Sequence, residues 1–270
     1  MVCFQAGAAL AKNLFPLVGA AGATALRTGI AAVMLFAVWR PWRVRCTWTE
    51  ARTIILYGMS MGCMNLCFYS SLKTIPLGVA VALEFTGPLA VAVAASRRPL
   101  DYLWIAMAVL GLLALLPLHI GAQRLDPLGI ALALGAGACW ALYIVFGRKA
   151  GAAHGGQITA LGMLVSALMI VPIGLAENGK ALFSPAVLPI GIGVALISSA
   201  LPYSLEMIAM PRIPTRTLGV VLSLDPALGA VAGLVFLGES LSWLQWGAIA
   251  CIMAASAGST TSHAAQPLPN

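Results

Sequence analysis

The sequence contains little charge. Only 9% of its 270 residues are Asp, Glu, Lys or Arg, whereas a soluble globular domain carries roughly a quarter. Hydrophobic residues make up 61% of the chain. Water therefore cannot be the main solvent of this protein, which excludes an ordinary soluble domain.

Several motifs of catalysis and metal binding are also absent. The sequence has no GxxxxGK[ST] nucleotide loop, no HExxH motif, no paired CxxC motif and no GxSxG motif within a plausible soluble fold. Cys63 and Cys67 lie four residues apart, a spacing open to metal binding, but packing in a helix bundle is the commoner role of such cysteines. We therefore predict no enzyme activity, no cofactor and no metal.

The sequence contains long segments without a charged residue. They cover residues 53–72, 102–118, 127–147, 157–176 and 240–262. Each is close to the ~20 residues that an α-helix needs to cross about 30 Å of hydrocarbon. The blocks are too long and too rich in Ala, Leu and Gly for barrel strands of about ten alternating residues. The sequence therefore predicts an all-α membrane protein.

Ten hydrophobic segments are visible along the chain. Their approximate limits are 1–14, 20–40, 52–72, 76–96, 101–118, 127–147, 156–176, 186–208, 215–238 and 240–262. The first segment is too short to span a bilayer, and no basic leader or cleavage site marks it as a signal peptide. We expect its helix to begin upstream of Met1, so that the first span is truncated in this chain.

Basic residues in the connectors predict the orientation in the membrane. The connectors after segments 2, 4, 6 and 8 hold ten Lys and Arg residues, and the alternate connectors hold three. By the positive-inside rule, the former and both termini are cytoplasmic. The net charge of +7 is thereby explained by topology, and we expect no nucleic-acid partner.

An internal repeat relates the two halves of the chain. A single offset of 138 residues aligns Pro76 with Pro214, Pro88 with Pro226, Asp101 with Glu239 and Asn65 with Tyr203. We place the first repeat at residues 1–120, the second at 121–262 and a short cytoplasmic tail at 263–270. Because five spans is an odd number, the second repeat must be inserted upside down. Inverted repeats around a midplane site are the architecture of secondary transporters.

Five charged residues lie within the predicted spans. They are Lys12, Arg27, Glu84, Glu206 and Asp225. Each costs at least ~2.5–3.5 kcal/mol at the centre of a helix in the bilayer, so such residues are candidates for function. Two basic and three acidic groups suit the carboxylate and the ammonium of a zwitterion, with one acid left to carry a proton.

Glu84 is the favoured proton carrier. Pro88 lacks the backbone donor that would bond to the carbonyl of Glu84, which predicts a polar cavity at that point. A purely structural alternative is that Glu84 pairs with Lys12 or Arg27.

The other acidic residues have similar alternatives. Asp225 directly precedes Pro226 and is a candidate for the substrate or proton path. Glu206 lies near the cytoplasmic end of its span, where it either lines the path or reaches the membrane interface.

Arg27 is the better of the two basic residues as a carboxylate anchor. A guanidinium binds carboxylates with two parallel hydrogen bonds, and Arg27 is well inside its span. Lys12 is close to a helix end, so it either lines the path or reaches the interface.

Polar and aromatic side chains in the spans are candidates for a cavity wall. These are Asn65, Trp140, Tyr143 and Tyr203. Packing in the core is the commoner role for such aromatic residues. The pairs Gly58/Gly62 and Gly229/Gly233 have the small-xxx-small spacing that lets helices approach closely.

Three strings carry a resemblance to a known family. They are PLGVAVALEFTGPLA at 76–90, ALALGAGACWALY at 131–143 and ALPYSLEMIA at 200–209, and FLGESL at 236–241 is similar to an end-of-repeat signature. With these strings the chain resembles the EamA branch of the drug/metabolite transporter superfamily. The resemblance extends over the whole chain.

The resemblance implies ten transmembrane helices and proton-driven efflux of small amino acids, threonine or homoserine, across a bacterial inner membrane. Two alternatives remain open. One is an exporter of another metabolite or a drug with the same architecture, and the other is a membrane-embedded partner protein or enzyme that transports nothing.

Overall fold

The computed structural model describes residues 1–43, 46–94, 99–115, 125–151, 155–209 and 222–263. Within these ranges the chain forms helices joined by short connections, and no strand is present. The predicted all-α class is therefore confirmed for this part of the chain. Several predictions lie outside the described residues: Pro214, the boundary at 120/121, nearly all of the tail and six of the basic connector residues, Arg45, Arg97, Arg98, Arg124, Arg212 and Arg216.

Most of the predicted segments correspond to one helix each. These are α1 (Val2–Lys12), α2 (Phe15–Trp39), α3 (Trp48–Ser71), α6 (Pro99–Leu115), α7 (Pro127–Gly151), α8 (Gly155–Asn178) and α13 (Trp243–His263). Short 3-10 turns follow α2 at Pro41–Arg43 (η1) and α8 at Gly179–Phe183 (η2). Among the described residues, four helical stretches are long and apolar enough to cross a membrane, namely Phe15–Trp39, Pro127–Ala150, Gly156–Asn178 and Val187–Leu205.

The predicted segment 76–96 is broken into two helices. Helix α4 (Leu77–Glu84) is followed by α5 (Thr86–Ala94), and the single residue Phe85 separates them. Pro88 explains the break, because it offers no N–H to the carbonyl of Glu84. Glu84 is thereby placed at the end of a helix in the interior of the protein.

The predicted segment 215–238 is also interrupted. Helix α12 (Asp225–Leu237) begins after a turn at Ser223 and Leu224, with Pro226 in its first turn, where proline is well tolerated. Asp225 is therefore the first residue of a helix, whereas Glu84 is the last residue of one. Residues 215–221 of the predicted segment lie outside the described part of the chain.

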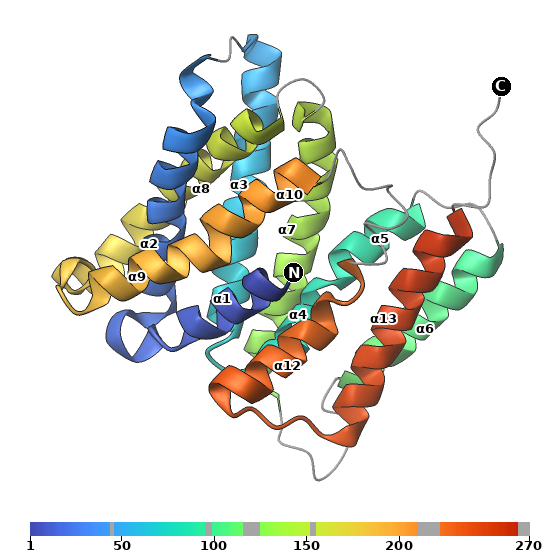
Figure 1. The fold of residues 1–270 in the computed structure, drawn as a ribbon. Helices are drawn as coiled ribbons and strands as arrows, with labels where there is room; N and C mark the ends of the chain where they lie inside the picture. The colour runs from blue at the N-terminus through green and yellow to red at the C-terminus, as the bar shows by residue number, and fades with distance from the viewer. Residues whose placement is uncertain (44–45, 95–98, 116–124, 152–154, 210–221, 264–270) are drawn as a thin grey trace.

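The predicted segment 186–208 contains a wider turn. Helix α9 (Val187–Ala195) passes through a π-turn, η3 (Leu196–Ala200), into α10 (Leu201–Ala209). In Figure 1, α9 and α10 form one long rod that crosses in front of α2, α3 and α8. Single π-turns within helices are rare and occur frequently at functional sites.

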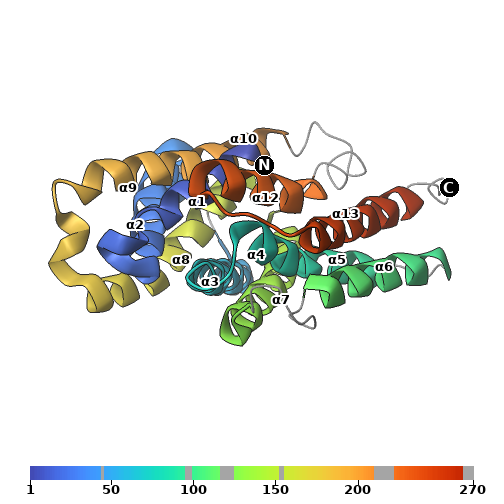
Figure 2. The ribbon, with the colours of Figure 1, turned by 90° about the horizontal axis from the view of Figure 1, so that it is seen from below.

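The helices pack in pairs drawn from the two halves of the chain. Helix α2 packs on α8, α3 on α7 and α8, and α6 on α13. Both views show α6 and α13 side by side at one edge of the molecule (Figure 1, Figure 2). On the other face, η3 packs on α1 and α2, and α12 packs on α4 and α1.

Glycines allow the closest of these crossings. A methyl group on Gly58 would lie 2.7 Å from the carbonyl oxygen of Gly162 in α8, and one on Gly229 would lie 2.9 Å from Val81 in α4. Gly87 faces Gly137 of α7 so closely that a methyl group on it would overlap the backbone. The packing role predicted for the glycine pairs is thus confirmed at these positions.

Candidate functional site

A cavity with both polar and apolar walls lies where the broken segments meet α1, α2, α3, α7, the π-turn and α10. Its volume is about 110 Å³, several times the ~10–15 Å³ that one buried water needs. Of the nine residues predicted for the path, seven line it: Arg27, Asn65, Glu84, Trp140, Tyr143, Tyr203 and Asp225. Residues that are far apart in the sequence are therefore gathered around one space.

Arg27 brings a positively charged side chain to the cavity wall. Helix α2 holds it in the interior, where only 4% of the residue is exposed. Its Nη1 donates to the carbonyl oxygen of Ser198 at 3.2 Å and to the hydroxyl of Ser199 at 2.7 Å. Its Nη2 donates to the side-chain oxygen of Asn65. All three acceptors are neutral.

Asn65 and Tyr69 also fix the position of this guanidinium from α3. The amide nitrogen of Asn65 donates to the carbonyl oxygen of Met61 at 2.8 Å, which turns its oxygen toward Arg27. The ring of Tyr69 stacks over the guanidinium carbon of Arg27 at 4.7 Å from its centroid, a cation–π contact. The charge is therefore oriented before any ligand arrives.

Part of the guanidinium is left without a partner. Its Nε is buried and has no hydrogen-bond partner among the described residues. The bonds to Ser198, Ser199 and Asn65 use three of the five N–H groups, so Nε–H and one Nη2–H remain. Two such donors can hold a carboxylate with two parallel bonds.

The two carboxyl groups of the cavity come from the broken segments. Glu84 ends α4 and is 8% exposed, and Asp225 begins α12 and is 6% exposed. The Oδ1 atom of Asp225 is buried and lacks a hydrogen-bond partner in the described part of the protein, as does the Oε1 atom of Gln5 in α1. Residues that line the cavity therefore carry unpaired acceptors as well as an unpaired donor, and each of these atoms is itself enclosed by protein.

The aromatic residues of the wall also pack against the core. Trp140 meets the ring of Phe85 edge to face at 5.8 Å, and Tyr203 meets that of Phe4 at 5.1 Å. Tyr143 stacks on Tyr57 at 4.8 Å. Cavity wall and core packing were alternatives at the level of sequence, and these three side chains take part in both.

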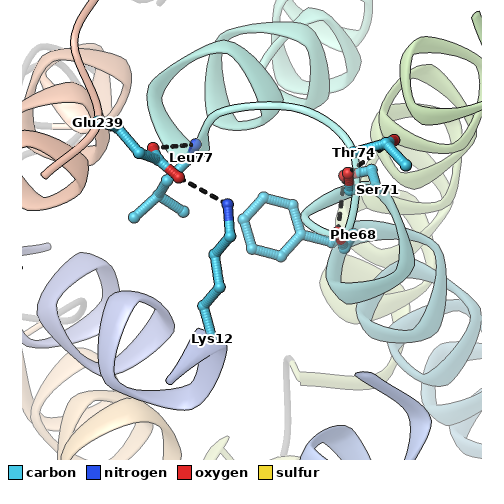
Figure 3. A network of polar contacts seen from close by, with 6 residues as sticks. All are labelled: Lys12, Phe68, Ser71, Thr74, Leu77 and Glu239. Carbon is cyan, nitrogen blue, oxygen red and sulfur yellow. Dashed lines mark hydrogen bonds and ion pairs between the residues drawn. The ribbon is translucent and has the colours of Figure 1, made fainter. Parts of the chain in front are cut away.

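Lys12 lies elsewhere. Its Nζ contacts Oε1 of Glu239 at 2.6 Å, and the other oxygen of Glu239 accepts a hydrogen bond from the N–H of Leu77 at 2.7 Å (Figure 3). Lys12 does not line the cavity and is not paired with Glu84. Arg27 likewise makes its hydrogen bonds to neutral groups, so the purely structural pairing considered for Glu84 is absent from these contacts.

Glu206 cannot be placed relative to the cavity. Its backbone belongs to α10, but its side chain lies outside the described part of the structure. Its predicted role in the path is therefore untested.

Three polar residues of the site have no distinctive signal in the sequence. Gln5 lies in the first hydrophobic segment, and Ser198 and Ser199 lie in an apolar stretch of small residues. Serine is common in such stretches and is uncharged, so its presence predicts nothing about a binding site. Only the π-turn places these serines against Arg27.

Sequence comparison identifies the family. A family model described as "EamA-like transporter family" matches residues 127–261. The threonine/homoserine exporter RhtA of Escherichia coli K12 is 55% identical over 260 residues, which cover 96% of this chain and 88% of that protein. The chain belongs to the EamA-like transporter family. It is accordingly a transport protein of apolar helices and not an enzyme.

Other relatives agree with this assignment. The RhtA protein of Salmonella typhimurium LT2 is 53% identical over 267 residues, covering 99% of this chain and 90% of its own. The uncharacterized transporter YwfM of Bacillus subtilis is 29% identical over 232 residues, covering 82% and 77%. A solved crystal structure with 20% identity superposes with a TM-score of 0.61 and covers 97% of this EamA-like chain and 96% of its own, which shows a common fold.

Proposed function

We propose that this chain exports small amino acids, threonine and homoserine, across the bacterial inner membrane in exchange for protons. The names of the relatives that are 53–55% identical support this substrate class. Threonine and homoserine both carry a carboxylate, an ammonium and one hydroxyl on a short chain. A binding site for them needs a donor pair, an acceptor and little space.

The unpaired polar atoms of the cavity carry the proposal. Buried polar atoms nearly always have a hydrogen-bond partner, so an unpaired one requires an explanation. Arg27 Nε is a charged donor and Asp225 Oδ1 is a carboxyl acceptor, and both residues line the same cavity. A zwitterionic amino acid would satisfy both, with its carboxylate on Arg27 and its ammonium on Asp225.

Glu84 is then free to carry the proton. The cavity contains two carboxyl groups, and one ammonium group needs only one of them. Protonation of Glu84 removes a negative charge from a buried site, which links its state to the occupancy of the cavity. Export of substrate and entry of a proton would alternate at this residue.

The mechanism we propose is alternating access between two inverted five-helix repeats, residues 1–120 and 121–262. Contacts between equivalent helices support it, since α2 packs on α8 and α6 on α13. Helix α3 packs on α7 and α8. Its counterpart in the second repeat, the segment 187–209, packs on α1 and α2, which are the counterparts of α7 and α8. Interrupted helices around a central site are typical of transporters with this architecture. Both termini would face the cytoplasm.

Purified protein in liposomes tests the proposal. Vesicles loaded with threonine should release it faster when an imposed pH gradient drives protons inward, and collapse of the gradient should remove that increase. A rate of threonine release that is the same with and without the pH gradient would contradict proton exchange. Intracellular threonine in cells with and without the protein tests the substrate independently, because an exporter lowers it.

A transporter of larger metabolites is a second candidate. Phe4, Phe68, Trp140 and three tyrosines line the cavity, and apolar ligands pack well on such side chains. Competition of labelled threonine with a panel of aromatic and aliphatic metabolites separates the two candidates. A protein that transports nothing is disfavoured, because three of the five predicted charges share one cavity.

A further inference from the structure

The hydroxyl of Ser199 lies against the charge that we assign to substrate binding. It is fully buried and accepts a hydrogen bond from Arg27 Nη1 at 2.7 Å. Ser199 belongs to the π-turn η3, and the preceding residue gives its carbonyl oxygen to the same nitrogen. Two acceptors from one turn therefore occupy Nη1.

Helix α1 packs closely against the π-turn at this position. A methyl group on Gly7 would overlap both the backbone and the side chain of Ser198, so only glycine allows α1 to approach η3 this closely. The close packing of α1 thus fixes the position of η3, and η3 holds Nη1 of Arg27 through its two hydrogen bonds.

We infer that Ser199 is a positioning residue for substrate recognition. By occupying Nη1, together with Ser198, it leaves Nε–H and the remaining Nη2–H for the carboxylate of the substrate. Ser199 need not touch the substrate. Its effect passes through Arg27 and depends on the carboxylate of the substrate. This inference rests on the proposed function.

Transport kinetics with two related substrates test the inference. Ser199→Ala should raise the KM for threonine about tenfold, since a hydrogen bond to a charged group is worth roughly that factor in affinity. The maximal rate should change little. Inhibition by threoninamide, which has no carboxylate, should be the same in Ser199→Ala and in the unchanged protein.

Two controls separate positioning from folding. Ser166→Ala removes another fully buried serine hydroxyl, one in α8 without a partner among the described residues, and should leave the KM unchanged. In an Arg27→Lys background, Ser199→Ala should add no further increase. Equal loss of threonine and threoninamide recognition would overturn the inference. If Arg27→Lys itself leaves the KM unchanged, the proposed carboxylate anchor is wrong instead.

Glu239 supports a second and independent inference. It follows Gly238, which has a left-handed backbone (φ 65°) at the end of α12, and its own N–H donates to the carbonyl oxygen of Gly233 at 3.1 Å. The carboxylate is thereby held against the end of α12. A methyl group on Gly233 would lie 2.6 Å from Glu239 Oε2, so the carboxylate would have to shift from its place against α12.

The carboxylate of Glu239 joins α12 to two other helices. It accepts the first backbone N–H of α4, that of Leu77, which the preceding Pro76 cannot cap with its own side chain. It also pairs with Lys12 at the end of α1 (Figure 3). The other ends of α4 and α12 carry Glu84 and Asp225.

We propose that Lys12, Glu239 and the N–H of Leu77 form a latch that closes one end of the transport path. In the proposed topology the ends of α1 and α12 and the start of α4 all face the periplasm. In this proposal, opening the path on that side moves α12 away from both α4 and α1, on which it packs, and so breaks both contacts of Glu239. The latch therefore holds the state in which the cavity is closed to the outside.

Cross-linking tests the latch. In a variant that lacks the six native cysteines, Lys12→Cys and Glu239→Cys should react with a short bifunctional methanethiosulfonate reagent, which joins the two thiols through reducible disulfide bonds. The cross-linked protein should lose threonine transport and recover it on reduction. Transport at the same rate with the link in place would overturn the latch. A reduced double variant that is folded but inactive would also overturn it, because a latch stabilises only one state.

Threonine transport by the parent protein, which keeps its six cysteines, shows which of the two proposals has failed. If the cysteine-containing parent protein transports no threonine, the proposed function fails and not the latch alone. Thermal unfolding of the reduced double variant reports separately whether it is folded.

Discussion

Glu84 and Asp225 line one cavity from opposite ends of two different helices. Glu84 is the last residue of α4, and Asp225 is the first residue of α12. Each lies shortly before a proline that interrupts its segment, Pro88 and Pro226. The chain thus places two carboxyl groups in its interior at the points where backbone hydrogen bonding is broken. The following predictions test how the two groups divide their tasks.

Glu84→Gln should uncouple transport from protons. Glutamine keeps the size of the side chain but cannot release a proton, so substrate exchange should persist while stimulation by a pH gradient disappears. Liposomes with a pH-sensitive dye inside measure this as loss of threonine-induced proton movement. Glu177→Gln, which changes an exposed carboxylate near the end of α8, is the matched control and should behave as the unchanged protein.

Asp225→Asn should weaken substrate binding and leave proton coupling intact. Removing one partner of a buried charge pair costs roughly 2 kcal/mol or more, which corresponds to about a 30-fold higher KM for threonine. The number of protons moved per threonine should not change. An unchanged KM together with lost coupling would show that the roles of Glu84 and Asp225 are reversed.

Tyr69→Leu should reduce affinity more than Tyr69→Phe. The ring over Arg27 stabilises the guanidinium, and a cation–π contact of ~1 kcal/mol corresponds to about a fivefold rise in KM. Phenylalanine keeps the ring face and loses only the hydroxyl. Measured KM values for threonine in the two variants decide this, and equal values would indicate that the ring contact contributes nothing.

Gly87→Ala should destabilise the protein. The added methyl group would overlap the backbone of Gly137, where α5 crosses α7, and overpacking of this kind costs typically ~1–3 kcal/mol. Thermal unfolding in detergent should show a lower midpoint. Gly135→Ala is a control from α7 itself: nothing lies within 4 Å of its added methyl group, and alanine favours a helix more than glycine does. A lower midpoint for Gly135→Ala would indicate a general sensitivity of α7.

Much of the fold was predictable because hydrophobic runs have few alternatives in a bilayer. The limits of α7 and α8 are close to those of the uncharged blocks, since a span must satisfy every backbone group within itself. The break at Phe85 was foreshadowed by Pro88. The π-turn at Leu196–Ala200 was not, because no residue in that stretch forbids an ordinary helix.

The candidate site was predictable where charge marked it. Arg27, Glu84 and Asp225 stand out because an ionisable residue in a span is costly. The same argument selected Lys12, which the structure places in an ion pair outside the cavity. The free-energy cost of a charge in the bilayer does not distinguish a charge that binds a ligand from a charge that is paired within the protein. That difference depends on Glu239, a residue in the connection between α12 and α13.

The sequence by itself determined the helical class of the protein, most of its hydrophobic segments and the short set of charged residues among which a site had to be sought. These follow from composition and from the cost of charge in lipid, which are local properties. Only the tertiary structure decided which of those charges meet. Arg27 and Asp225 share a cavity and Lys12 does not, because helices from both halves cross at η3 and at the broken segments. Proximity across the chain is a property of packing, and no local pattern contains it.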